Sequence, residues 1–224
     1  MPLAIPVEIP VGSQSLPGDL CTPPAAHGVV VFAHGSGSRR FSTRNQFVAR
    51  VLERRGMATL LIDLLTPREE VIDARTTEYR FDIPMLADRL GMIVDWLQAQ
   101  KATAMLPIGL FGASTGGGAA LIAAARRPQV IAAVVSRGGR PDLAGPALQH
   151  VSAPTLLIVG GLDRSVLQMN RDAMQQMRHN VILKIVPGAT HLFEEHGALE
   201  RVAALTAEWF AEYLQPAAAT PRGR

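Results

Sequence analysis

Cysteine is almost absent from this chain, which has one, Cys21, in 224 residues. A single cysteine cannot form a disulfide within the chain, and it cannot supply a CxxC redox pair or a cysteine zinc site. The sequence also lacks any apolar run near the roughly 18 residues that cross a bilayer, and its N-terminal segment lacks the basic and apolar regions of a secretory signal. We therefore expect a cytoplasmic protein without a membrane partner.

Neither sign of charge dominates the sequence. Lysine and arginine number 22 against 19 acidic residues, for a formal net charge of +3, and the arginines are scattered along the chain. A nucleic-acid-binding surface usually needs basic residues massed together, so no nucleic-acid partner is expected. The hydrophobic content of 48% is enough to build the core of one large domain.

Short apolar runs alternate with longer helical patterns from residue 28 nearly to the end. The run at 28–33 is continuously apolar and β-branched, which is typical of a strand covered on both faces. Five similar runs follow, at 58–62, 107–111, 130–135, 155–159 and 181–186. Helical spacing predicts helices between them and after the last one. This alternation predicts an α/β domain with a mostly parallel, twisted sheet and helices on both faces.

The chain reads as a single domain. Residues 1–27, with prolines around short alternating segments, predict one or two antiparallel edge strands that belong to the domain of residues 28–215. Residues 216–224 have nothing to pack, which predicts a disordered tail. The connection between the strands at 130–135 and 155–159 is too short to form a cap domain.

The segment Gly112-Ala113-Ser114-Thr115-Gly116 follows a predicted strand and leads into a helix. This is the context of the G-x-S-x-G elbow, a sharp turn that exposes the serine Oγ above the sheet edge. The turn also places the N–H of Thr115 at a helix N-terminus, where developing negative charge is stabilised. Ser114 is therefore a candidate nucleophile, and Thr115 a candidate oxyanion donor.

A serine nucleophile needs a base, and the base needs an orienting acid. Asp163 follows the strand at 155–159, and His191 follows the strand at 181–186. Because parallel strands end at a common edge of the sheet, we expect both residues to lie near Ser114. One alternative remains open. Asp163 would then only cap the next helix, and Asp142 would be the acid in its place.

Three further segments are expected to border the cleft. The glycine-rich turn after the first core strand offers the N–H of Ser36, within one residue of register, as the second oxyanion donor. In the same turn, His34 and Gly35 either support its backbone or contact the substrate. Arg137 or Arg140 is expected either to face the substrate or to stabilise a solvated loop. An arginine that faces the substrate would favour an acyl group with a carboxylate or phosphate. The charged segment 66–81 would form a second wall, and no histidine pair has metal-ligand spacing.

Together these segments resemble the α/β-hydrolase family, and more closely its dienelactone-hydrolase-like branch without a cap domain, over residues 28 to 214. Dienelactone hydrolases proper carry a cysteine nucleophile at the elbow, where this chain has Ser114. The resemblance implies a serine hydrolase that cleaves carboxylic esters of small to medium acyl chains through an acyl-enzyme, with no metal or organic cofactor. The small-molecule ester would be its partner, and the chain a monomer or homodimer. Alternatives are lactone or amide hydrolysis, acyl transfer, and a binding protein without activity.

Overall fold

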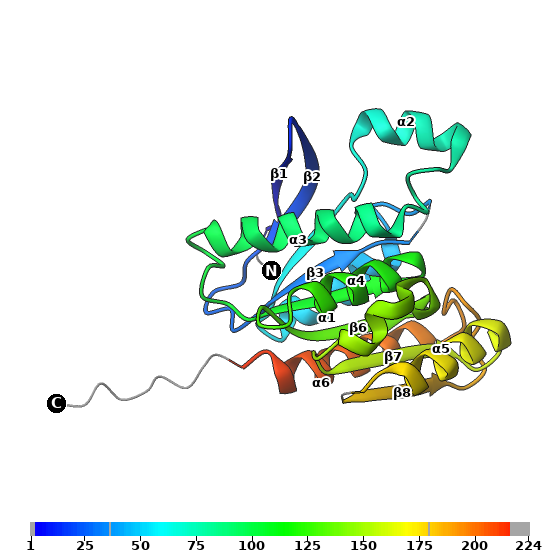
Figure 1. The fold of residues 1–224 in the computed structure, drawn as a ribbon. Helices are drawn as coiled ribbons and strands as arrows, with labels where there is room; N and C mark the ends of the chain where they lie inside the picture. Colours follow the sequence, from blue (N-terminus) through cyan, green and yellow to red (C-terminus); the bar gives the residue numbers. More distant parts are fainter. Residues whose placement is uncertain (1–2, 36, 179, 216–224) are drawn as a thin grey trace.

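The computed structural model describes residues 3–35, 37–178 and 180–215, which form one eight-stranded sheet flanked by helices (Figure 1). The strands run across the sheet in the order β1-β2-β4-β3-β5-β6-β7-β8. Their bounds are β1 (Ile5–Val11), β2 (Gln14–Cys21), β3 (Val29–Ala33), β4 (Ala58–Ile62), β5 (Ile108–Ala113), β6 (Ile131–Arg137), β7 (Thr155–Gly160) and β8 (Val181–Val186). The helices are α1 (Thr43–Arg54), α2 (Pro67–Thr76), α3 (Ile83–Ala99), α4 (Thr115–Arg126), the 3-10 helix η1 (Pro141–His150), α5 (Arg164–Gln176) and α6 (Ala198–Tyr213).

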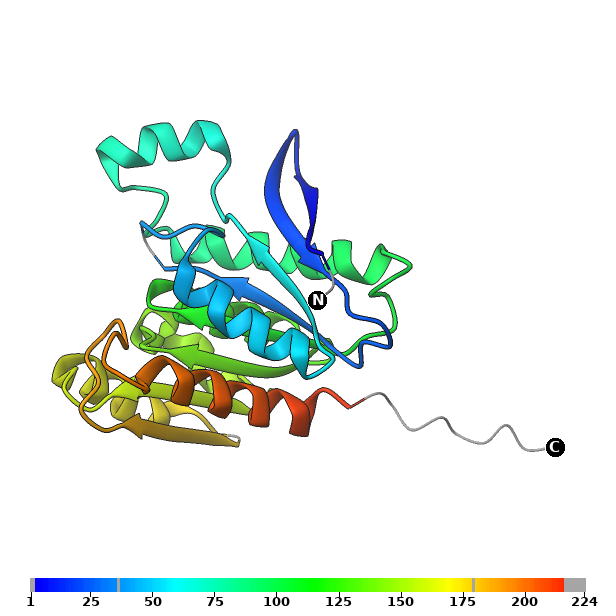
Figure 2. The same cartoon turned by 180° about the vertical axis from the view of Figure 1, so that it is seen from behind.

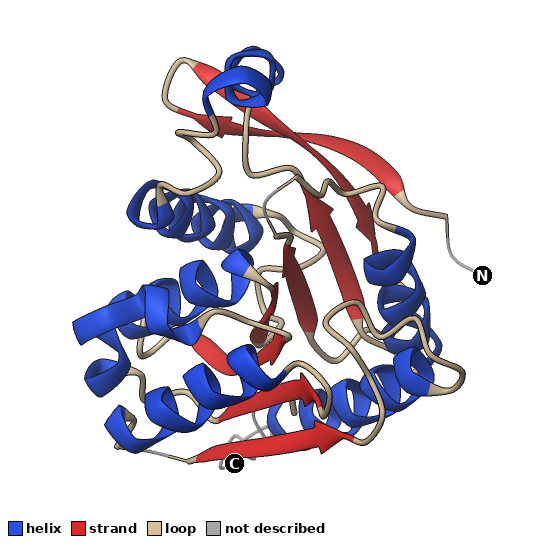
Figure 3. Ribbon diagram, turned by 90° about the vertical axis from the view of Figure 1, so that its right-hand side faces the viewer, coloured by secondary structure: helices blue, strands red, loops and turns tan. Residues whose placement is uncertain are grey.

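The strands from β3 to β8 pair in parallel, as the alternation of apolar runs predicts. All five residues of β3 are buried because successive side chains enter different helix layers. Val29 and Val31 pack in the core with α3, α4 and α5, whereas Val30 and Phe32 pack with α1 and α6. Figure 3 shows helices on both sides of the sheet, and α1 and α6 lie in front of it in Figure 2. The predicted fold class is therefore confirmed.

The N-terminal segment adds a hairpin to the sheet. β1 pairs antiparallel with β2, and β2 pairs antiparallel with β4, so β1 is an edge strand. Ile9 and Leu16 face each other across the hairpin and are fully buried, which attaches the hairpin to the main core. The predicted tail at 216–224 lies outside the described residues, as do Met1 and Pro2.

The sequence does not predict α2 as a helix. It predicts only that the charged segment 66–81 forms a wall of the cleft. Its few apolar residues give no helical stripe, but its N-terminus carries a capping box. The Thr66 side chain accepts the N–H of Glu69, the Glu69 carboxylate accepts the N–H of Thr66, and Pro67 starts the first turn. In Figure 1, α2 stands apart from the two helix layers, above the same end of the molecule as the β1–β2 hairpin.

The register of the parallel strands determines which residues meet at their carboxyl ends. Ala33 of β3 lies beside Gly112 of β5, and Ala113 lies beside Arg137 at the end of β6. The segments that follow β3, β5, β6, β7 and β8 therefore share one edge of the sheet.

Among the described helices, none is long and apolar enough to pass through a bilayer.

The close approach of α4 to β3 leaves no room for a Cβ at Gly116. A Cβ at this position would lie 2.2 Å from the Ala33 carbonyl oxygen and 2.6 Å from the His34 carbonyl oxygen, and backbone atoms cannot move aside cheaply. We expect Gly116→Ala to lower the free energy of unfolding by about 3 kcal/mol, measured by urea denaturation.

The matched control is Gly91→Ala within α3. Its Cβ would meet the flexible end of the Arg127 side chain at 3.2 Å, so we expect a change of at most about 1 kcal/mol, because alanine favours helix. Equal urea midpoints for wild type and Gly116→Ala would contradict the packing argument.

Candidate active site

Ser114 lies in a strained turn between β5 and α4. Its φ of 51° and ψ of −123° are costly for a residue with a Cβ. The backbone is fixed on both sides: its N–H donates to the Arg137 carbonyl at 3.2 Å, and its carbonyl accepts the N–H groups of Gly117 and Arg140 at 3.0 Å. A Cβ at Gly112 would lie 2.5 Å from the Cα of Gly117, so only glycine lets the chain turn this sharply. This geometry matches the predicted elbow.

Asp163 is the N-cap residue of α5, but its side chain makes no capping hydrogen bond. Its Oδ2 instead accepts the Nδ1–H of His191 at 2.6 Å, and its side chain is 11% exposed. The alternative acid, Asp142, is engaged by the guanidinium of Arg140 at 2.7 and 2.9 Å. The structure therefore brings Asp163, and not Asp142, together with His191. This contact leaves the Nε2 of His191 free of the carboxylate and able to accept a proton.

The loop that carries His191 is held from two sides. Glu195 accepts hydrogen bonds from the N–H and the hydroxyl of Thr190 at 3.0 and 2.5 Å, and the Thr190 hydroxyl in particular lowers the pKa of the Glu195 carboxyl. On the other side, Gly138 packs against His191 with a φ of 50°, and a Cβ there would lie 3.5 Å from the imidazole ring. Sequence reasoning missed both residues, because a loop glutamate and a glycine after a strand carry no distinctive pattern.

His34 supports the turn that follows β3. The ring is buried, its Nδ1–H donates to the Gly35 carbonyl at 3.0 Å, and its Nε2 accepts the N–H of Leu64 at 3.1 Å. Burial lowers the pKa of His34, which favours this neutral form. Gly35 lies against Ser114, because a Cβ added at Gly35 would lie 2.8 Å from the Cβ of Ser114. Ser36, the predicted second oxyanion donor, lies outside the described residues.

Two cavities meet at Gly35 and Ser38. The Ser114 cavity, about 270 Å³, is lined by Gly35, Ser38, Ser42, Arg44, Ala113, Ser114, Arg137, His191 and Leu192. The α2 cavity, about 400 Å³, is bounded by both apolar and charged side chains, including Leu65, Val71, Ala74, Leu86, Glu70 and Arg80. Thr115, the predicted oxyanion donor, is buried at the first position of α4 and lines the α2 cavity. The candidate site therefore has a polar part at Ser114 and a more apolar part beneath α2.

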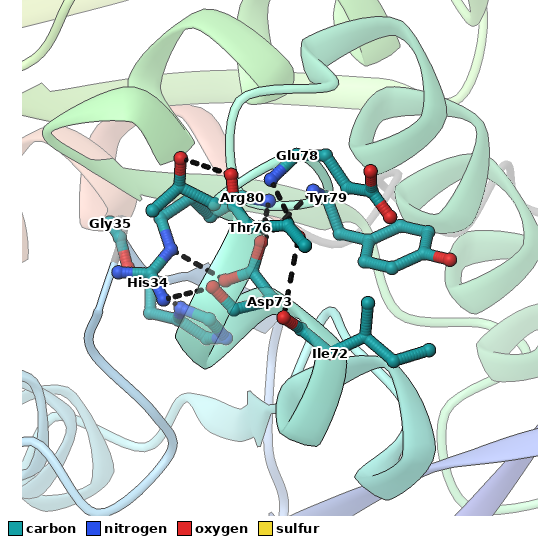
Figure 4. A network of polar contacts seen from close by, with 9 residues as sticks. His34, Gly35, Ile72, Asp73, Thr76, Glu78, Tyr79 and Arg80 are labelled. Atoms are coloured by element: carbon teal, nitrogen blue, oxygen red, sulfur yellow. Dashed lines mark hydrogen bonds and ion pairs between the residues drawn. The ribbon is translucent and has the colours of Figure 1, made fainter.

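A network around Asp73 fixes the wall formed by α2 (Figure 4). The Asp73 carboxylate accepts the N–H groups of Tyr79 and Arg80 at 2.9 Å and the Nε–H of Arg80 at 2.5 Å. Burial alone would raise the pKa of Asp73, but the hydrogen bonds from Arg80 and Tyr79 outweigh it and hold the pKa below its usual value. The segment 66–81 thus borders the cleft, as the sequence predicts.

The two candidate arginines have different surroundings. Arg140 pairs with Asp142 and is not among the described residues that line either cavity. Arg137 lines the Ser114 cavity and is 8% exposed. Within the described part of the chain, no group of three or more histidine, cysteine or acidic side chains could hold a metal ion.

Comparison with known proteins gives close relatives over nearly the whole chain. A model of the dienelactone hydrolase family matches residues 16–215. The crystal structure of dienelactone hydrolase from Anabaena variabilis is 58% identical, with a TM-score of 0.94 over 96% of this chain and 99% of that one. Est1E from Butyrivibrio proteoclasticus shares the fold at 17% identity, with a TM-score of 0.77 over 93% of this chain and 98% of that one.

A longer relative carries a different name. A protein of Mycobacterium tuberculosis strain H37Rv, named a putative phosphoribosyl transferase, is 54% identical over 208 residues. The match covers 93% of this chain and 46% of that protein, so the chain spans about half the length of the curated relatives it matches. The family model, the Anabaena structure and the shared architecture agree, and the chain belongs to the dienelactone hydrolase family, with the α/β-hydrolase fold.

Proposed function

We propose that this protein is a serine hydrolase that cleaves carboxylic esters of small to medium acyl chains through an acyl-enzyme intermediate. The observation that carries the proposal is the 2.6 Å contact between His191 and Asp163 beside the cavity that contains Ser114. Membership of a hydrolase family supports it independently.

In this mechanism, the Nε2 of His191 takes the proton of the Ser114 hydroxyl as Oγ attacks the ester carbonyl. Asp163 keeps the Nδ1 of His191 protonated and stabilises the imidazolium that forms. The tetrahedral oxyanion is stabilised by the N–H of Thr115 at the start of α4, where the helix dipole favours negative charge, and by the N–H of Ser36. His191 then returns the proton to the leaving alcohol.

Water completes the cycle. His191 removes a proton from a water molecule that attacks the acyl carbonyl, and collapse of the second tetrahedral intermediate releases the acid and restores the Ser114 hydroxyl. Each step uses groups of the chain itself, so the proposed reaction calls for no metal or organic cofactor. The α2 cavity, with Leu65, Val71 and Leu86 among its lining residues, suits a small to medium acyl chain.

Lactone hydrolysis is the second candidate, because the Anabaena relative at 58% identity is named a dienelactone hydrolase. The same attack on a cyclic ester would open the ring, and the elbow chemistry is shared with amide hydrolysis and acyl transfer. The name of the M. tuberculosis relative describes a protein of about twice the matched length. A serine–histidine–aspartate arrangement supports acyl chemistry rather than phosphoribosyl transfer.

Loss of the nucleophile is the direct test of this proposal. We expect a fluorophosphonate to add once to the wild type and not to Ser114→Ala, as measured by intact-protein mass. We also expect Ser114→Ala to lower ester turnover by at least about 10⁴-fold, with little change in melting temperature. The control, Ser152→Ala at an exposed position, should label as the wild type does. Labelling of Ser114→Ala would place the nucleophile elsewhere.

Two aspartates distinguish the proposed acid from the alternative. Asp163→Asn removes the charge that holds the His191 tautomer, so we expect kcat/KM for a nitrophenyl ester to fall by about 10³- to 10⁴-fold. Asp142→Asn removes only the pair with Arg140 and should change kcat/KM by less than about threefold. The reverse ranking of the two variants would reassign the acid.

The packing of Gly138 against the imidazole gives a test of His191 placement. Gly138→Ala would place a Cβ 3.3 Å from the His191 carbonyl oxygen, a tight contact that would shift the His191 backbone and its ring, so we expect kcat/KM to fall by about 10-fold. Gly145→Ala is the matched control, because its φ of 49° is close to that of Gly138 and a Cβ there would have nothing within 4 Å. Both variants should lose similar stability on urea denaturation, and equal activities would show that Gly138 does not position His191.

A further inference from the structure

Arg137 is a buried cation beside the proposed nucleophile. It is the last residue of β6, it lies opposite Ala113, and its carbonyl accepts the N–H of Ser114 at 3.2 Å. The residue is 8% exposed, and its Nε and Nη1 atoms have no hydrogen-bond partner among residues 3–35, 37–178 and 180–215. A buried charge without a partner is strongly destabilising, so a protein rarely keeps one that has no ligand to meet.

A second cation lies at the same cavity. Arg44, in the first turn of α1, lines the Ser114 cavity together with Arg137, and its buried Nε also has no hydrogen-bond partner in the described ranges. Burial, together with the nearby Arg44 charge, lowers the pKa of Arg137 to about 10. Arg137 therefore remains charged at neutral pH.

The carboxylates near these arginines offset part of their charge, because Glu194 forms a salt bridge with Arg44, whereas the Nε and Nη1 of Arg137 have no partner in the described ranges. Asp163 is engaged by His191, and the exposed Glu194 reaches only the Nη1 of Arg44, at 3.1 Å. Ser38 and Ser42 add hydroxyl groups to the lining of the same cavity. The Ser114 cavity thus has two guanidinium groups and two hydroxyls besides that of Ser114, and these donors match an anionic group with several acceptor oxygens.

We propose that the Ser114 cavity binds a phosphate group carried by the alcohol half of the ester, held by Arg137 and Arg44. The inference rests on the proposed function, because it places the ester carbonyl at Ser114. The alcohol is assigned to this cavity because its oxygen must receive the proton of His191, which lines the Ser114 cavity and is absent from the described lining of the α2 cavity. The acyl chain then extends beneath α2.

Two arginines favour phosphate over carboxylate. A phosphate monoester carries close to two negative charges at pH 7 and three acceptor oxygens, whereas a carboxylate offers one charge and two oxygens. Because Glu194 already pairs with Arg44, charge balance alone does not separate the two ligands, but the three oxygens of a phosphate can accept hydrogen bonds from both guanidinium groups at once. The preferred substrate class is therefore the carboxylic ester of a phosphorylated alcohol.

A matched set of substrates tests the proposal. We would measure acid release from the butyrate esters of 2-hydroxyethyl phosphate, 3-hydroxypropionate and 2-methoxyethanol. We expect kcat/KM to be at least about tenfold higher for the phosphate ester than for the neutral ester, with the carboxylate ester between them. Equal kcat/KM for the phosphate and neutral esters would overturn the proposal. A preference for the carboxylate ester over the phosphate ester would overturn the assignment of a dianion.

Variants show whether the arginines carry the preference. Arg137→Met and Arg44→Met should each lower the phosphate-to-neutral ratio of kcat/KM by about 10- to 100-fold. Arg140→Met should keep the wild-type ratio, since its guanidinium pairs with Asp142 and lines neither cavity among the described residues. If Arg137→Met does not fold, Arg44→Met supplies the same comparison. An unchanged ratio in the folded variants would overturn the proposal.

Inorganic phosphate separates this inference from the proposed function. Its binding to Ser114→Ala, measured by calorimetry, requires no catalysis, and we expect it to weaken by at least about tenfold when Arg137→Met is added. If fluorophosphonate labelling fails but phosphate still binds in a way that depends on Arg137, only the proposed esterase function is overturned. Phosphate binding that is absent, or independent of Arg137, in a protein that still labels at Ser114 would overturn only the phosphate site.

Discussion

The backbone contact around Ser114 is the constraint on which the rest of the site depends. Gly112 lies against Gly117, and Gly116 lies against the end of β3, at distances that no Cβ could occupy. These contacts, with the hydrogen bonds to the Ser114 backbone, hold a non-glycine residue at a φ of 51°. Such a conformation costs on the order of 1–3 kcal/mol and persists only where the surroundings determine it fully.

The same edge of the sheet determines how Asp163 and His191 meet. β7 and β8 pair in parallel up to Gly160 and Val186, so the loops that follow them start side by side. Asp163 is placed where an aspartate ordinarily caps a helix, but its carboxylate turns to His191 instead. α5 therefore gives up a stabilising cap, usually worth about 1 kcal/mol, for a contact that orients the imidazole.

The cleft divides its chemistry between two cavities. Arg137 lines the Ser114 cavity, and its backbone is held in the sheet between β5 and β7. The α2 cavity, in contrast, is bounded by a helix outside the two main layers and is stabilised by the carboxylate of Asp73. A rigid polar part beside a separately supported wall is consistent with a substrate that has two unlike halves.

The sequence by itself determined the α/β fold class, the strand positions and the elbow at Ser114, because hydrophobic periodicity and turn residues are local properties of the chain. It also indicated Asp163 and His191, since the ends of parallel strands must share an edge. It favoured Asp163 but left Asp142 open as a substitute, and it did not predict α2 as a helix or separate Arg137 from Arg140. Those outcomes depend on strand register and on which side chains find partners: Asp142 pairs with Arg140, whereas the Nε and Nη1 of Arg137 have no hydrogen-bond partner among the described residues. Only the tertiary structure decides them, because burial and pairing arise from contacts between residues far apart in the chain.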